Sequence, residues 1–195
     1  MRVLLFCIAI ILSRFSGAGS VRLLIFSISG MALFPRYLLL AVLLLLADQA
    51  TKLMILANFE LGEHVELTPF FSLILVYNPG AAFSFLADAS GWQKWFFVLL
   101  AAAISLWIVV LLWRHPERRR ENIALSLIMG GALGNTVDRL AYGKVVDFLD
   151  FHLGGHHWPA FNLADAGITI GAALLALDAW LAWRSGKEAA PGVSP

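Results

Sequence analysis

Four long apolar stretches, separated by shorter polar segments, dominate the chain. They run from Tyr37 to Ala57, from Trp92 to Trp113, from Asn122 to about Leu140, and from Leu163 to Trp183. A helix needs about 20 mostly apolar residues to cross the hydrocarbon core of a bilayer. Only a helix or a closed barrel bonds all of its backbone groups within lipid. The pattern therefore predicts an all-α polytopic membrane protein with four transmembrane helices.

A short extended segment is predicted between the first and second stretches. Residues 67–77 combine β-branched and aromatic side chains, contain Pro69, and end at the turn Asn78-Pro79-Gly80. This composition is typical of a strand or of one arm of a hairpin. Residues 81–86 could form the second arm or a half-helix.

The positively charged residues predict the orientation of the four stretches. If the stretches alternate in direction, one side receives Arg36, Arg114, Arg118, Arg119, Arg120, Arg184 and Lys187. Short loops rich in Lys and Arg stay in the cytoplasm. Both termini are therefore expected to be cytoplasmic, and the segments 58–91 and 141–162 are expected on the outer side.

The two ends of the chain depart from the pattern of long apolar stretches. The apolar run Val3–Leu12 is too short to span a bilayer. We interpret residues 1–30 as a dispensable extension, with an interfacial or fifth membrane segment as the alternative. The membrane domain is expected over residues 31–188, followed by a mobile tail over residues 189–195.

Composition narrows the class of protein further. Hydrophobic residues make up 60% of the 195 residues and charged residues 14%, against roughly 25% charged residues in an ordinary soluble domain. The net charge is only +1, so the sequence predicts no binding to nucleic acid. The single cysteine, Cys7, excludes a disulfide framework and a metal cluster held by thiolates.

Charged and amide side chains interrupt the apolar stretches, and they gather near one membrane face. By the expected topology, the outer boundary collects Asp48, Lys52, Asp138, Arg139, Asp147, Asn162 and Asp165. A charge within a membrane span is costly and requires a partner or a function. Because these groups lie in one layer, they are candidates for a site at the outer membrane surface.

Each of these polar residues also has a purely structural interpretation. Asp48 and Lys52 are four residues apart and could form an ion pair on one helical face. Asp138 could pair with a neighbouring helix, and Asp165 could complement the dipole at a helix N-terminus. Likewise, the small residues Gly130 and Gly134 favour close helix packing over ligand contact.

Asp147 and Asp165 form the strongest candidate pair for catalysis. Asp147 is flanked by valines, a phenylalanine and a leucine, an apolar setting for an acid. Two carboxylates held close together at low dielectric cannot both ionise. One then donates a proton while the other accepts one from water, as in an aspartic protease. Their spacing permits a meeting across the outer loop.

Five ordered blocks carry a resemblance to a known family. They are Asp48-Gln49-x-x-Lys52, residues 77–84 (YNPGAAFS), residues 130–139 (GGALGNTVDR), residues 145–148 (VVDF) and residues 161–165 (FNLAD). In content, order and spacing the chain resembles bacterial lipoprotein signal peptidase (signal peptidase II) over about residues 31–185. Residues 1–30 lie outside the family pattern.

The resemblance implies a fold, an activity and a set of site residues. Four transmembrane helices and a small periplasmic β-element between the first and second are expected, in the bacterial inner membrane. The family cleaves prolipoproteins before a cysteine that carries diacylglycerol, uses no metal or other cofactor, and is inhibited by cyclic lipopeptides such as globomycin. By position, Asp147 and Asp165 match the catalytic pair. The residues expected to line the site or bind substrate are Asn78, Gly80, Asn135, Arg139, Asn162, Asp48, Lys52 and Asp138. The amides of the three asparagines could bond the extended backbone of the cleavage segment.

Two other functions compete with this interpretation. His152, His156 and His157 occupy the outer loop near both acids, and zinc takes such ligands, so a metalloprotease is one alternative. The other is a small transporter, channel or sensor, since intramembrane Asp and Lys also mark proton pathways. However, the polar groups gather at one face instead of crossing the membrane.

Overall fold

Four helices make up most of the part of the chain that the structure describes. The computed structural model covers residues 28–80 and 92–188. The helices are α2 (Ile28–Asn58), α3 (Trp92–Arg114), α4 (Arg119–Tyr142) and α5 (Leu163–Glu188). Each contains one of the four apolar stretches, so the helical prediction is confirmed. The expected domain boundary at residue 31 falls within α2, whereas residues 1–27, 81–91 and 189–195 lie outside the described residues.

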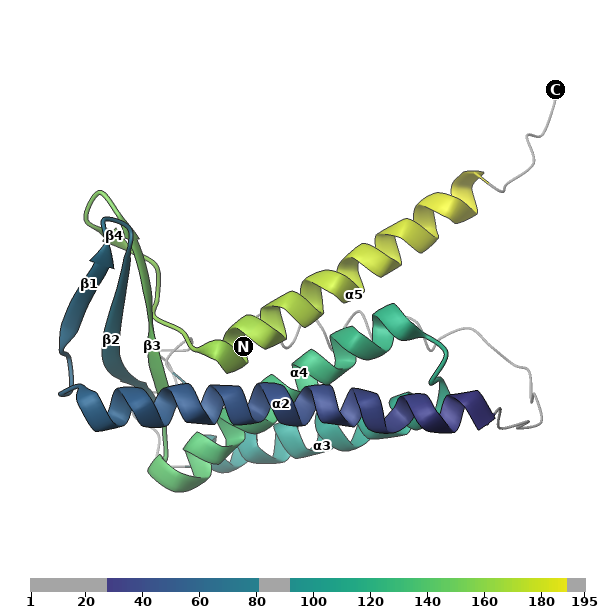
Figure 1. The fold of residues 1–195 in the computed structure, drawn as a ribbon, viewed down its shortest axis with the longest axis horizontal. Helices are drawn as coiled ribbons and strands as arrows, with labels where there is room; N and C mark the ends of the chain where they lie inside the picture. The colour runs from purple at the N-terminus through teal and green to yellow at the C-terminus, as the bar shows by residue number, and fades with distance from the viewer. Residues whose placement is uncertain (1–27, 81–91, 189–195) are drawn as a thin grey trace.

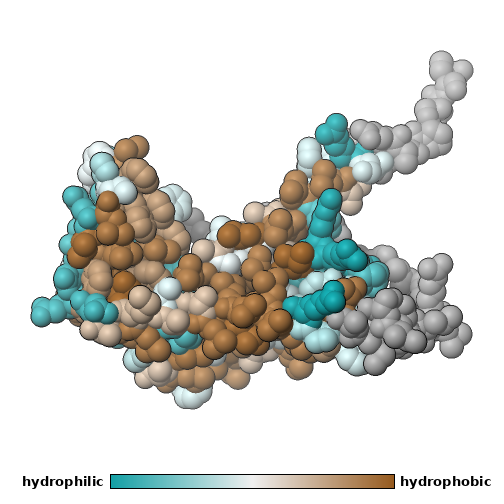
Figure 2. All heavy atoms as spheres, in the orientation of Figure 1, coloured by the Kyte–Doolittle hydropathy of each residue, from teal (hydrophilic) through white to brown (hydrophobic). Residues whose placement is uncertain are grey.

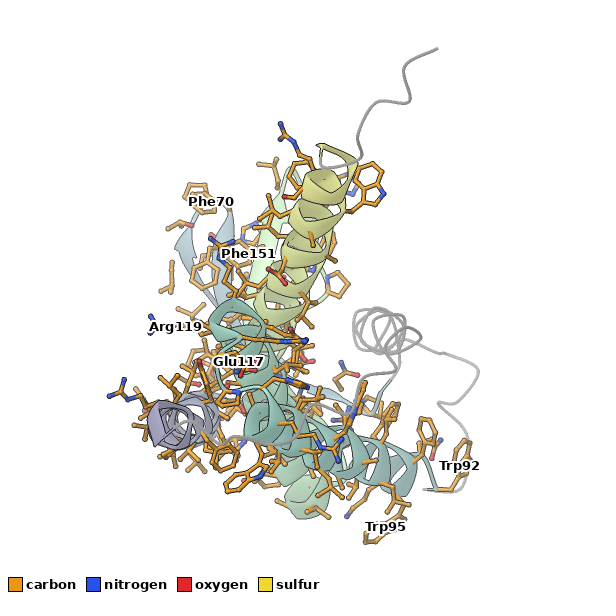
Figure 3. The ribbon with its side chains drawn as sticks, turned by 90° about the vertical axis from the view of Figure 1, so that its right-hand side faces the viewer. Phe70, Trp92, Trp95, Glu117, Arg119 and Phe151 are labelled. Atoms are coloured by element: carbon orange, nitrogen blue, oxygen red, sulfur yellow. The ribbon has the colours of Figure 1, made fainter. Side chains whose placement is uncertain are left out.

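Three of these four helices are long and apolar enough to cross a membrane. They are α2 from Leu33, α3 along its whole length, and α5 as far as Ser185. Their outward faces carry many exposed leucines, and Figure 2 shows this apolar surface over the helices, with hydrophilic residues toward their two ends. In Figure 3 the side chains of Trp92 and Trp95 point away from the bundle at the start of α3. Such aromatic residues are typical of the membrane–water interface.

The helix α4 differs from the other three. It contains 24 residues and is not among the helices apolar enough to span a membrane by composition. It packs against α2, α3 and α5, and half of its side chains, Asn122 and Asp138 included, are buried. Because its neighbours cover it, α4 can carry polar groups that a lipid-facing helix could not.

An antiparallel sheet lies at one end of the helices (Figure 1). Its strands, in spatial order, are β1 (His64–Thr68), β2 (Phe71–Asn78), β3 (Val145–Leu153) and β4 (His156–His157). β1 and β2 follow α2, whereas β3 and β4 follow α4. The sheet therefore joins two segments that are far apart in sequence.

The sequence prediction of the β-element was incomplete in two respects. Residues 67–77 do not form one strand, because the turn at Pro69 and Phe70 separates β1 from β2. A proline has no N–H to give to a sheet, which explains the break. Half of the sheet also comes from the loop expected between the third and fourth helices. Residues 145–148 are all buried, so β3 lacks the alternation of polar and apolar residues that identifies a strand.

Glycines allow α4 to approach two neighbouring helices closely. A Cβ atom added at Gly130 would lie 2.6 Å from the carbonyl oxygen of Ala41 in α2. A Cβ atom at Gly131 would overlap the carbonyl oxygen of Ala164 in α5. A Cβ atom at Gly134 would lie 2.6 Å from Asp48 Oδ2 in α2, so the packing interpretation of Gly130 and Gly134 is confirmed. The close contact of Gly131 with α5 fixes the start of that helix.

Candidate active site

Backbone pairing brings the segment before α5 alongside β3. The amide of Leu149 donates to the carbonyl of Phe161 at 2.8 Å, and the amide of Phe161 donates back at 3.1 Å. Asp147 therefore lies on a strand, and Asp165 follows in the first turn of α5, at the place where these two elements meet. The meeting of the two acids across the outer loop, expected from the sequence, has this structural basis.

Two asparagine amides hold the carboxylate of Asp147, which is almost completely buried. Asn162 Nδ2 donates to one oxygen at 2.6 Å, and Asn78 Nδ2 donates to the other at 3.0 Å. Asn162 also caps α5, because its Oδ1 accepts the backbone N–H of Asp165 at 2.9 Å. A single side chain thus links both acids of the candidate pair.

Asp165 is held by a third asparagine. Asn135 Nδ2, from α4, donates to Asp165 Oδ1 at 2.8 Å. The Oδ1 atom of Asn135 in turn lies 3.2 Å from the Nδ2 atom of Asn162 and 3.2 Å from the Nζ atom of Lys52. The amides of Asn162 and Asn135 therefore form a connected chain between the two carboxylates and the buried lysine.

Lys52 is the centre of a buried ion cluster. Its Nζ atom lies 2.8 Å from a carboxylate oxygen of Asp48 and 2.8 Å from one of Asp138, so the ion pair expected from the sequence is present. The other oxygen of Asp48 accepts the N–H of Ala164, and Asp138 accepts the N–H of Val146. The cluster thus holds the backbone immediately before each candidate catalytic acid.

A cavity of about 290 Å³ opens beside these residues. Its polar lining comes from Asn78, Asn135, Arg139 and Asp165, and its apolar lining includes Phe97. Arg139 donates to the carbonyl of Asn135 at 3.1 Å, and its guanidinium carbon lies 4.7 Å from the centre of the Phe97 ring. The carboxylate of Asp147 lies behind this lining, in contact with Asn78.

Burial is the main influence on the acidity of Asp147. Desolvation and the nearby charge of Asp165 raise the pKa of Asp147 from 3.8 to about 7. The hydrogen bonds from Asn78 and Asn162 and the charge of Lys52 lower this pKa, but by less than burial and the charge of Asp165 together raise it. At neutral pH this carboxyl group therefore carries a proton in a large fraction of molecules.

The structure joins all of the residues that the sequence singled out for this site. Gly80 belongs to the set because its N–H donates to Asn78 Oδ1 at 2.9 Å, in a backbone conformation with φ of +102°. From the sequence, the asparagine amides were expected to bond the substrate backbone, whereas the structure shows them bonded to the carboxylates of the acid pair. Gln49 was missed at the level of sequence, and its amide donates to Asp138 at 2.9 Å and to the carbonyl of Gly134 at 3.1 Å. Gln49 belongs to the first motif block, between Asp48 and Lys52, and this position could have identified it as a site residue.

The histidines of the competing metalloprotease interpretation lie apart from the acid pair. His152 is five residues after Asp147 on the same strand, so the two side chains point to opposite faces of the sheet. The remaining intramembrane acid, Asp178, lies beside Arg118 and Glu121 in a hollow near the connection between α3 and α4.

Comparison with known proteins gives a consistent set of relatives. The family model for signal peptidase (SPase) II matches residues 40–181. The lipoprotein signal peptidase of Ralstonia nicotianae is 60% identical over 139 residues, which is 71% of this chain and 80% of that protein. The lipoprotein signal peptidase of Cupriavidus taiwanensis is 56% identical over 142 residues, 73% of this chain and 81% of that protein.

Two solved structures, both described as a bacterial membrane enzyme studied by the in meso method, share the fold. One is 33% identical with a TM-score of 0.67, and the match covers 74% of this chain and 92% of that one. The other is 31% identical with a TM-score of 0.68, covering 82% and 95% respectively.

Proposed function

This chain belongs to the signal peptidase II family of lipoprotein-processing proteases, and from that premise we propose that it is an aspartic endopeptidase of the membrane. Its substrate is a prolipoprotein modified with diacylglycerol, and it cleaves the signal peptide before the lipidated cysteine. One observation carries the proposal. The carboxylates of Asp147 and Asp165 share one chain of asparagine amides at the edge of a cavity.

The proposed chemistry uses one proton shared between the two acids. The ionised carboxylate of Asp165 takes a proton from water, and the water oxygen attacks the peptide carbonyl carbon. Asp147, with its pKa of about 7, donates its proton to the carbonyl oxygen. Asp165 then donates its proton to the leaving nitrogen while Asp147 takes a proton back from one hydroxyl of the tetrahedral intermediate. The C–N bond breaks, and Asp147 is again protonated and Asp165 ionised. No metal is required at any step.

The asparagines serve the acids instead of the substrate backbone in this scheme. Asn78 and Asn162 orient Asp147, and Asn135 orients Asp165. Arg139 at the cavity wall is the group available to bind the carbonyl of an extended cleavage segment. The lipid chains of the substrate would lie against the exposed leucines of the helices and supply binding energy remote from the reacting bond.

The proposed topology places the site at the outer face of the inner membrane. In this arrangement all four helices cross, with α4 shielded by the other three, and both termini are cytoplasmic. The support is the arginine-rich connection between α3 and α4, which lies at the opposite end of the helices from the sheet (Figures 1 and 3).

The test is cleavage of a lipidated prolipoprotein by the purified protein in detergent. Asp147→Asn and Asp165→Asn should each lower kcat by at least about 10²-fold, because each removes one partner of the proton exchange. Both variants should remain folded, which thermal unfolding in detergent checks. Asp178→Asn, which alters an acid away from the site, should retain the wild-type rate, and globomycin should inhibit the wild type.

Two results would reject this assignment. Near-normal turnover by either variant of the acid pair would show that the pair is not catalytic. Loss of activity in EDTA without any fall in Tm would instead favour a metal-dependent reaction, whereas a folded aspartic protease keeps its rate.

A further inference from the structure

A second group of ionisable side chains lies on the sheet, apart from the acid pair. It consists of His64 on β1, Asp150 and His152 on β3, and His157 on β4. One potential ligand atom from each of His64, Asp150 and His152 lies within 4.8 Å of the others. His157 Nδ1 lies 2.9 Å from Asp150 Oδ2, and its ring centre is 5.0 Å from that of His152.

The register of the strands explains why these side chains meet. Asp150 and His152 are two residues apart on β3, and His152 is paired with His157. Asp150 is paired with Ser72 of β2, and His64 is paired with Ile74, two residues further along β2. Because side chains alternate along a strand, all four project from the same face. Asp147 is three residues before Asp150 and therefore projects from the other face.

We propose that His64, Asp150, His152 and His157 bind one divalent transition-metal ion of the Zn²⁺ class. Three imidazole nitrogens and one carboxylate oxygen are a donor set that suits zinc, whereas calcium and magnesium prefer oxygen ligands. Four ligands about 2.0–2.2 Å from an ion lie roughly 3.4 Å from one another. The distances from Asp150 Oδ2 to His64 Nε2 and to His157 Nδ1, 3.4 and 2.9 Å, are already close to that spacing.

The cluster has further features of a metal site. The Asp150 side chain is 6% exposed and lies within 3.4 Å of both His64 and His157. The buried Ser72 hydroxyl lies 2.8 Å from His152 Nε2 and fixes the orientation of that ring, as outer partners of metal-bound histidines do. His64 and His157 are 34% and 53% exposed, which gives an ion access from solvent.

A bound ion would link three strands of the sheet. His64 belongs to the segment after α2, and the other three ligands belong to the segment after α4. The ion would therefore stabilise the same sheet that holds Asp147, without contact to that carboxylate. This inference does not depend on the proposed peptidase function, because the ligands lie on the opposite face of β3.

The experiment is titration of the full-length chain, purified without a polyhistidine tag, with Zn²⁺ in detergent. We expect one equivalent to bind the wild type and to raise its Tm. His64→Ala and Asp150→Asn should each weaken binding by at least about tenfold, since loss of even an outer partner commonly costs that much. His115→Ala should bind as the wild type does, because His115 lies in the connection between α3 and α4.

Three outcomes would overturn the site. They are an absence of binding by the wild type at micromolar Zn²⁺, equal binding by His64→Ala and the wild type, and loss of binding in Asp147→Asn. The last result would place the ion at the acid pair. Normal binding by Asp147→Asn together with loss of its peptidase activity would separate the two sites.

Discussion

At the residue scale, the two acids of the site differ in what surrounds them. Asp147 accepts amide hydrogen bonds on both oxygens and is buried, whereas Asp165 accepts one from Asn135 and lines the cavity. Burial raises the pKa of the first acid despite these hydrogen bonds, so it is suited to hold the shared proton, and the second is suited to contact water. Asn162 couples them by bonding Asp147 and capping the helix that carries Asp165.

The pH dependence of cleavage should reveal the proton held by Asp147. Because its pKa is raised to about 7, the acid stays protonated to higher pH than usual and loses its proton as the pH passes about 7. We expect kcat/KM to fall on that alkaline side, and to fall at acidic pH when the second carboxyl is also protonated. A rate profile in constant ionic strength measures both limbs.

A substitution at Asn78 sharpens this prediction. Asn78→Ala removes a hydrogen bond that favours the ionised form of Asp147, so the pKa should rise and the alkaline limb should move to higher pH. A shift to lower pH, or a profile without an alkaline limb, would assign the proton to another group. The position of the limb is informative even if the variant is slower overall.

The buried cluster around Lys52 yields a prediction about stability. Lys52→Met leaves two buried carboxylates without their cation, so the free energy of unfolding should fall by about 3–5 kcal/mol. Thermal unfolding in detergent measures the loss. Arg36→Met removes an exposed cation from the same helix and should have little effect. Adding Asp138→Asn to Lys52→Met should restore part of the loss, and no recovery would contradict the electrostatic explanation.

At the scale of elements, the sequence predicted helices better than strands. Apolar stretches located all four helices, because three of them contain about 20 apolar residues and α4 keeps enough apolar residues to be recognised despite its polar ones. In contrast, residues 145–148 of β3 are all buried, so the strand lacks the alternation of polar and apolar residues that would identify it. Its pairing with β2 depends on residues far apart in sequence, as the hydrogen bond between Asn78 and Asp147, 69 residues apart, illustrates. The motif blocks identified the site residues, but which amide faces which acid required the fold.

The contact between α4 and α5 gives a prediction at this scale. Gly131→Ala would place a methyl group against the carbonyl of Ala164, the residue before Asp165, so the first turn of α5 would have to move. Overpacking of this kind costs about 1–3 kcal/mol. Both Tm and kcat should therefore fall. As a control, Ala141→Ser adds one heavy atom at an exposed position of α4 and should change neither Tm nor kcat. Normal activity in Gly131→Ala would contradict the prediction, because it would show that the first turn of α5 can move without loss of function.

At the scale of the whole molecule, the polar helix and the apolar helices have different roles. α2, α3 and α5 present apolar surfaces suited to lipid, and α4 lies among them with the asparagine, aspartate and glycines of the site. Composition separates α4 from the other helices, since no window over α4 is apolar enough to qualify as a span, but only the packing shows that the other three helices cover it. The packing explains how a chain this apolar can hold several charges within its helices.

The orientation of the molecule can be tested with single cysteines in a Cys7→Ser background. If α4 crosses the membrane, Glu66→Cys on β1 should face outward, whereas Glu117→Cys between α3 and α4 and Ser185→Cys near the end of α5 should face the cytoplasm. All three positions are exposed, so access to each thiol depends on the membrane alone. A membrane-impermeant maleimide should therefore label the first variant in intact spheroplasts and the other two only after lysis. Labelling of both Glu66→Cys and Glu117→Cys in intact spheroplasts would mean that α4 does not cross, because β1 follows α2 and is joined through β2 to β3, which follows α4. Labelling of Glu117→Cys without Glu66→Cys would invert the topology. The sheet and the acid pair would then face the cytoplasm, where a lipidated cysteine anchored in the outer leaflet could not reach them.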